Sequence, residues 1–187
     1  EILKKSIGYG LRAQIGNAFQ ILNYRIDQVI VGGLLGAEAL GPYVVAAKAA
    51  ELFKFFGASI VFVLESTLAS DSVKNAAETV KKNSRRVLAV NGILVVIGMV
   101  MVPLFLPLFF GKWSVASVLP FLTISVGMLI SGANGLYGAF NFSIGKPEWN
   151  TQVILLGFVV IVLANFLLVP KFGAVGAAAA AAVMQVA

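Results

Sequence analysis

The chain has 187 residues, of which 59% are hydrophobic and only 12% are charged, with a net charge of +6. Together with a mean hydropathy of +0.95, this composition excludes an ordinary soluble globular domain and predicts an integral membrane protein. Cysteine and histidine are both absent, which excludes thiolate nucleophiles, imidazole acid–base catalysis and the usual zinc and haem ligand sets. We therefore expect a protein that is not an enzyme, with no catalytic residues, metal site or cofactor.

Six apolar segments follow one another along the chain. Two of them, residues 87–110 and 151–169, contain no charged residue and are long enough to cross a bilayer core of about 30 Å, which takes roughly 20 helical residues. The predicted spans cover residues 7–35, 42–68, 87–110, 115–142, 151–169 and 174–187, the last of them incomplete. Because neither end resembles a natural boundary, we expect the chain to be a fragment of a longer protein that forms one transmembrane unit.

The first predicted span is strongly polar on most of its circumference. On a helical wheel its apolar residues fall within an arc of about 100°. The remaining arc carries eight polar or charged side chains: Arg12, Gln14, Asn17, Gln20, Asn23, Arg25, Asp27 and Gln28. A charged group at the bilayer centre costs about 2.5–3.5 kcal/mol even on the lenient insertion scale. This face should therefore meet another helix or a water-filled cavity.

The second predicted span repeats the pattern. Lys48, Glu51 and Lys54 follow at a spacing of three residues, and Glu65 falls on the same face. One interpretation is a local ladder of ion pairs that packs this helix. The other is a polar lumen shared with the first span, because the third and fifth predicted spans carry no charge.

The distribution of basic residues between the connections predicts the orientation. Eight lie on one side of the predicted spans: Lys4, Lys5, Lys74, Lys81, Lys82, Arg85, Arg86 and Lys146. Only Lys112 and Lys171 lie on the other side. Since basic loops stay in the cytoplasm, residues 70–86 are predicted to be cytoplasmic.

Two stretches resemble a known family. They read "NYRIDQVIVGGLLGAEALGPYVVAAK" and "VPKFGAVGAAAAAAV", and Gly145–Lys146 before the fifth span also fits. In order and spacing they resemble the lipid-linked oligosaccharide flippases, of the O-antigen and exopolysaccharide type, in the multidrug/oligosaccharidyl-lipid/polysaccharide (MOP) exporter superfamily. The resemblance implies an all-α membrane protein. It implies one six-helix lobe, the C-terminal one, of a two-lobed transporter with 12 or more helices.

The same resemblance implies a function and a location. The expected function is to flip undecaprenyl-pyrophosphate-linked oligosaccharide repeat units from the cytoplasmic to the outer leaflet, by alternating access, during polysaccharide biosynthesis. The expected location is the cytoplasmic (inner) membrane, as a multi-pass protein. The expected partners are the lipid-linked substrate, the bilayer, the second six-helix lobe, a polysaccharide polymerase and glycosyltransferases, with no nucleic acid.

Site residues follow from the implied cargo. A basic lumen suits a pyrophosphate, and the fork of donors on arginine suits it best. We expect Arg25 first, and then Arg12, Lys48 and Lys54, to bind the pyrophosphate. The amides Asn17, Gln20, Asn23 and Gln28 are expected to bind sugar hydroxyls. The carboxylates Asp27, Glu51 and Glu65 either couple transport to a proton or sodium gradient or balance the positive charge.

Two other functions fit the residues. A MATE-type cation-coupled multidrug antiporter lobe would need an acidic or aromatic lumen, whereas four bases and three acids lie in the first two spans. A non-transporting membrane scaffold would bury the polar face against a partner's helix. Water accessibility of a cysteine introduced at Asn17 or Gln20 separates the scaffold from both transporters.

Overall fold

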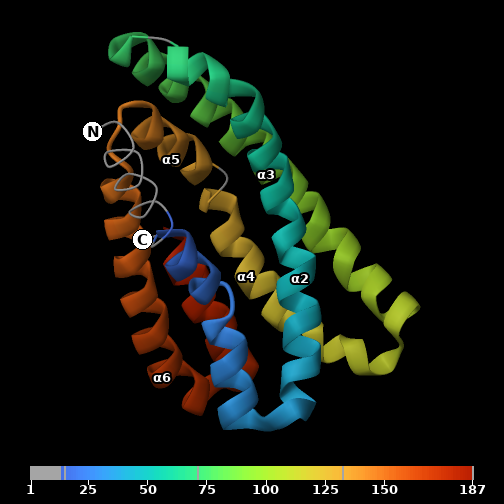
Figure 1. Cartoon of the computed structure of the whole chain (residues 1–187). Helices are drawn as coiled ribbons and strands as arrows, with labels where there is room; N and C mark the ends of the chain where they lie inside the picture. The colour runs from blue at the N-terminus through green and yellow to red at the C-terminus, as the bar shows by residue number, and fades with distance from the viewer. Residues whose placement is uncertain (1–13, 15, 71, 132, 187) are drawn as a thin grey trace.

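The computed structural model describes residue 14 and residues 16–186 except 71 and 132, and every regular element in this part of the chain is helical. A helical segment, residues 16–23, leads into the labelled elements. These are α2 (Ile26–Ser70), α3 (Val73–Phe110), the 3₁₀ helix η1 (Lys112–Ser117), α4 (Val118–Ser131), α5 (Asn134–Ser143) and α6 (Pro147–Val186) (Figure 1). Four helical stretches are long and apolar enough to cross a membrane: Gly16–Leu64, Val73–Phe110, Lys112–Leu129 and Pro147–Gln185. The predicted all-α membrane fold is confirmed.

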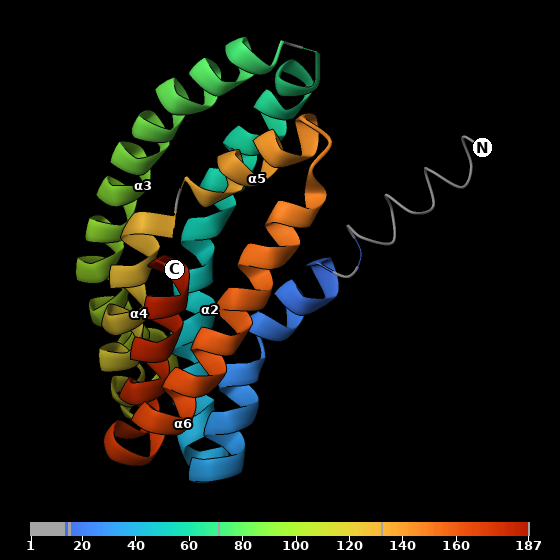
Figure 2. The ribbon, with the colours of Figure 1, turned by 90° about the vertical axis from the view of Figure 1, so that its left-hand side faces the viewer.

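Two of the long helices reverse direction at a glycine. Gly36 in α2 has φ 82° and ψ 177°, and Gly173 in α6 has φ 59° and ψ −140°. Both conformations lie in the region that side chains with a Cβ rarely adopt. Figure 2 shows that α2 and α6 each run down the bundle and return beside themselves. The reversals fall between predicted spans, and the division into six spans stays a prediction.

The reversals define two ends of the bundle. One end, which we name the turn end, holds the reversals of α2 and α6 together with η1. The other, the junction end, holds the junction between α2 and α3 and the junction between α5 and α6 (Figure 2). These two ends provide the frame for locating the site.

Helix α3 is longer than a bilayer core is thick. It begins after Ser72, whose side chain accepts a hydrogen bond from the Asn75 backbone N–H, the usual arrangement at a helix N-terminus. Its 38 residues correspond to about 57 Å at 1.5 Å per residue, against about 30 Å of hydrocarbon. The basic residues between 74 and 86 therefore form the first part of this helix at the junction end.

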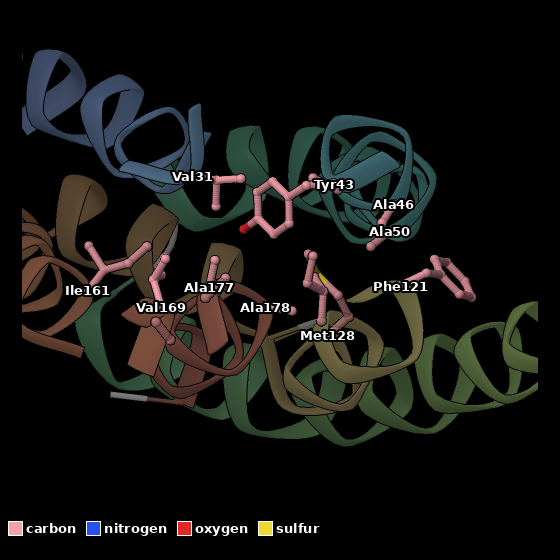
Figure 3. Close-up of a cluster of buried hydrophobic side chains, with 14 of the residues drawn as sticks. Val31, Tyr43, Ala46, Ala50, Phe121, Met128, Ile161, Val169, Ala177 and Ala178 are labelled. Carbon is pink, nitrogen blue, oxygen red and sulfur yellow. The ribbon is translucent and has the colours of Figure 1, made fainter. Parts of the chain in front are cut away.

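The main apolar core is built largely from small side chains of α2, α4 and α6. Ala46 and Ala50 of α2 and Ala177 of α6 are fully buried, and Tyr43 and Phe121 are the largest buried side chains. Figure 3 shows labelled members of this cluster pointing toward one another from these helices. Small side chains let the helices approach closely, because no hydrophobic force acts between helices within lipid and packing must supply the attraction.

Helix α4 lies very close to α6 at Gly127. A Cβ added at Gly127 of α4 would lie 2.7 Å from the Ala182 Cα and 2.8 Å from its carbonyl oxygen. No larger residue fits there without a shift of one backbone. The tight core and this contact hold α6 against α4.

Candidate functional site

A cavity of about 620 Å³ lies inside the bundle. Its walls come from residues 16–24, from the return half of α2, from α4 and α5 and from both halves of α6. Because α5 and the start of α6 lie at the junction end (Figure 2), this half of the bundle holds much of the cavity wall. Its volume is in the range of small-molecule sites, about 300–1,000 Å³.

Neutral polar side chains make up twelve of the 27 described lining residues, and most of the others are apolar or glycine. The twelve are Asn17, Gln20, Asn23, Tyr24, Asn91, Ser131, Asn134, Tyr137, Asn141, Asn150, Thr151 and Gln185. Among the described lining residues, Lys54 is the one side chain of the Lys, Arg, Asp and Glu types. The cavity therefore combines many neutral hydrogen-bonding groups with a single cation.

The wall formed by residues 16–24 repeats polar groups at helical spacing. Asn17, Gln20 and Asn23 follow every third residue and all face the cavity. Asn23 is buried, and its Nδ2 donates a 3.0 Å hydrogen bond to the Ile154 carbonyl oxygen of α6. Gln20 Nε2 donates to the Tyr24 hydroxyl at 3.3 Å. These bonds attach the first wall to α6 and orient the Tyr24 ring.

Lys54 interacts with this wall through an aromatic ring. Its Nζ lies 3.9 Å from the centroid of the Tyr24 ring, the geometry of a cation–π contact. The predicted ladder of three ionic residues is only half formed, because Lys48 Nζ pairs with Glu51 Oε2 at 2.5 Å while Lys54 is turned to Tyr24. No carboxylate among the described lining residues of the large cavity neutralises Lys54.

A smaller pocket of about 30 Å³ shares lining residues with the large cavity. Asp27, Glu51 and Lys54 line it, and its volume is about that of one water molecule. Asp27 is buried. Its Oδ2 accepts a 2.5 Å hydrogen bond from the Tyr43 hydroxyl, and its Oδ1 accepts one of 2.7 Å from the Gln28 backbone N–H. The carboxyl group is thus held by two donors, one on each side of the reversal at residue 36.

The structure brings some predicted site residues together and leaves others apart. Asn17, Gln20, Asn23 and Lys54 line the large cavity, and Asp27 and Glu51 line the small pocket. Arg25, Gln28 and Lys48 line neither. Arg12 and the side chain of Glu65 lie outside the described residues.

Arg25 does not line the cavity with the other polar residues of the first predicted span. It lies in a turn at residues 24–25 that separates segment 16–23 from α2, and it is exposed. Its Nη1 donates a hydrogen bond to Gln28 Oε1 at 3.2 Å. The polar arc of the first span covers much more than half of the wheel, so its members cannot all face one cavity. Asn17, Gln20 and Asn23 occupy one part of the arc and Arg25 another.

Sequence reasoning missed two groups of residues. The first is Tyr43, whose partner Asp27 is 16 positions earlier in the chain and beyond a reversal. The second is a row on α5: Asn134, Tyr137 and Asn141 all line the cavity. Their spacing of i, i+3 and i+7 marks one face of a helix. This signal was readable in the sequence, although single amides in a membrane helix are more often structural.

The fold and the cavity together define an integral membrane protein whose helix bundle holds a cavity lined by both polar and apolar side chains. A model of the polysaccharide biosynthesis protein family matches residues 1–119, which is more than half of the chain, and the chain belongs to this family. No curated protein and no solved structure matches it. The resemblance found in the sequence is confirmed at the level of the family, and the protein has a role in polysaccharide synthesis or export.

Proposed function

We propose that the protein transports undecaprenyl-pyrophosphate-linked oligosaccharide repeat units from the cytoplasmic to the outer leaflet by alternating access. The observation that carries the proposal is the cavity of about 620 Å³, whose described lining includes twelve neutral polar side chains and a single cation, Lys54. A lipid-linked sugar presents hydroxyls and a pyrophosphate, and these are the groups that such a lining binds. A cationic drug would meet Lys54 there and no carboxylate among the described lining residues of this cavity, so the cavity disfavours the antiporter.

The charge distribution supports an orientation for this transport. The first part of α3 carries Lys74, Lys81, Lys82, Arg85 and Arg86, and Lys146 lies at the α5–α6 junction. The turn end carries Lys112 and Lys171. By the positive-inside rule the junction end faces the cytoplasm. The cavity beside it would then receive substrate from the cytoplasmic leaflet of the inner membrane, and a second lobe would complete the transport path.

Lys54 is proposed as the contact for the pyrophosphate. Its ammonium group lies over the Tyr24 ring, and a pyrophosphate oxygen offers it a charge-assisted hydrogen bond of about 1.5–3 kcal/mol. Asp27 and Glu51 in the small pocket are the proposed sites for a coupling proton or sodium ion. Arg12 and Arg25 remain predicted contacts at other stages of transport.

Binding of farnesyl pyrophosphate to the full chain in lipid nanodiscs tests this proposal. Lys54→Gln should weaken binding by about 10- to 150-fold, the factor that 1.5–3 kcal/mol corresponds to. Lys48→Gln is the matched control, because Lys48 is exposed, pairs with Glu51 and does not line the cavity. Unchanged affinity in Lys54→Gln, with unchanged thermal stability, would contradict the proposed contact.

A further inference from the structure

We infer that the α5–α6 wall of the cavity is a sugar-recognition subsite, separate from the anion contact at Lys54. The inference rests on the proposed function and extends it to the part of the substrate that differs between polysaccharides. The family match ends at residue 119, before α5 begins at Asn134, so the inference rests on the geometry of α5 and α6.

The wall carries a continuous polar face on a short helix. Asn134, Tyr137, Gly138 and Asn141 follow at helical spacing on the ten-residue helix α5, and all four line the cavity. Asn150 lies across from them on α6. No Lys, Arg, Asp or Glu residue lies on the cavity side of this wall within the described chain. The wall can therefore bind neutral polar groups and has nothing to neutralise an anion.

Backbone carbonyls fix the orientation of the amides. Asn150 Nδ2 donates to the Gly138 carbonyl oxygen at 3.0 Å, and a carbonyl can only accept. Asn150 Oδ1 must then accept the 2.7 Å hydrogen bond from Asn141 Nδ2. Asn134 Nδ2 donates in the same way to the Gln185 carbonyl oxygen at 3.2 Å.

This network determines which ligand groups the wall prefers. Each Nδ2 carries two N–H groups, and the bonds described use one of them in Asn134 and one in Asn141. Each amide therefore keeps its Oδ1 as an acceptor and one N–H as a donor. A sugar hydroxyl both donates and accepts and can use both groups, whereas the oxygens of an ionised pyrophosphate can only accept.

Tyr137 adds a flat apolar surface beside these acceptors. Its side chain is 52% exposed and lies between Asn134 and Asn141 on the cavity face of α5. An aromatic face packs against the C–H groups of a sugar ring, while the phenolic hydroxyl can donate or accept. A ring with acceptor amides on both sides is a combination suited to a pyranose and not to a lipid tail or a phosphate.

The proposed anion contact and the proposed sugar contacts lie on different walls of the cavity. Lys54 belongs to α2 and contacts Tyr24, whereas the acceptor amides belong to α5 and α6. Gly138 lines this wall, and a Cβ there would lie 3.8 Å from Asn150 Nδ2, so a methyl group would fit at ordinary contact distance and narrow the cavity beside Asn150. A substrate with its pyrophosphate at Lys54 would place the attached sugars against α5.

The test compares four probes on the full chain in nanodiscs: farnesyl pyrophosphate and its glucosyl, galactosyl and N-acetylglucosaminyl esters. At least one ester should bind the wild type about tenfold more tightly than the bare lipid, the factor for one or two added hydrogen bonds. We call the ratio of the affinity for an ester to the affinity for the bare lipid the sugar advantage. Tyr137→Leu and Asn141→Leu should each reduce this sugar advantage by about 3- to 10-fold. Affinity for bare farnesyl pyrophosphate should change by less than about twofold, because neither residue contacts the anion site.

Two further variants separate recognition from folding. Trp149→Leu removes an exposed aromatic side chain from α6 that does not line the cavity, and it should leave the sugar advantage unchanged. Gly138→Ala keeps every hydrogen bond and favours the helix, yet the added methyl should reduce the sugar advantage without lowering thermal stability.

The outcomes separate the two proposals. Equal binding of all four probes, with binding still dependent on Lys54, would overturn the sugar subsite and leave the proposed function standing. An unchanged sugar advantage in Tyr137→Leu and Asn141→Leu would also overturn the subsite. A wild type that binds none of the four probes would overturn both.

Discussion

The hydrogen bond between Tyr43 and Asp27 gives the most quantitative prediction for the fold around the site. The Tyr43 side chain is fully buried, and its hydroxyl lies 2.5 Å from Asp27 Oδ2. Tyr43→Phe removes only the oxygen and leaves the ring in the core. The Asp27 carboxyl group would then keep a single described donor, the Gln28 backbone N–H.

The expected cost follows from the chemistry of the pair. A hydrogen bond to a charged acceptor contributes about 1.5–3 kcal/mol, and little cavity term is added because the ring stays in place. We therefore expect Tyr43→Phe to lower the free energy of unfolding by about 1.5–3 kcal/mol. Tyr137→Phe is the control: its side chain is 52% exposed, so it should cost less than about 0.5 kcal/mol.

Equilibrium unfolding in mixed micelles measures these values, and a double-mutant cycle with Asp27→Ala, which removes the acceptor of the Tyr43 hydroxyl, isolates the pair. If the two residues act on each other directly, the cycle should give a coupling energy above about 1 kcal/mol. A coupling energy below about 0.5 kcal/mol would refute the view that Tyr43 holds the carboxyl group.

Three further predictions concern packing, topology and Arg25. Gly127→Ala should destabilise the protein by about 1–3 kcal/mol in thermal melts, because the added methyl meets the backbone of α6. The control Gly33→Ala, with nothing within 4 Å of the added Cβ, should leave the stability unchanged or raise it by up to about 1 kcal/mol. Equal effects of the two substitutions would contradict the close approach of α4 and α6 at Gly127. A reporter fused after Lys81 should lie in the cytoplasm and one after Lys112 outside, and reversed locations would overturn the orientation. If Arg25 contacts pyrophosphate, Arg25→Lys should transport poorly and Arg25→Ala worse, both at normal protein levels in the membrane; full complementation by both variants would remove Arg25 from the site.

The sequence predicted the helical membrane fold because two simple signals agree. Uncharged runs such as residues 87–110 are long enough to span a bilayer, and glycines at 36 and 173 stand between apolar segments where the chain must turn. These signals are local, and each depends only on neighbouring residues. The start of α3 at Val73 was harder to predict, because its charged first turns are continuous with an apolar helix.

The site was predictable only in part. Asn17, Gln20 and Asn23 stand out because amides are costly in lipid, and they line the cavity. The setting of Arg25 depends on the turn at residues 24–25, which no proline or glycine marks. The pairing of Tyr43 with its carboxyl partner depends on how α2 folds back on itself. Such contacts between distant segments follow from the tertiary arrangement and leave no periodic signal in the sequence.

The central claim is that the cavity carries a lipid-linked sugar across the membrane. The direct measurement places the protein, together with the second lobe that would complete the transport path, in liposomes containing N-acetylglucosaminyl pyrophosphoryl undecaprenol. An impermeant galactosyltransferase and its nucleotide sugar are then added outside. Only sugars in the outer leaflet are modified. We expect wild-type liposomes to expose the inner-leaflet pool over time and the Lys54→Gln variant to do so much more slowly. A protected pool as large as that in protein-free liposomes would contradict the account.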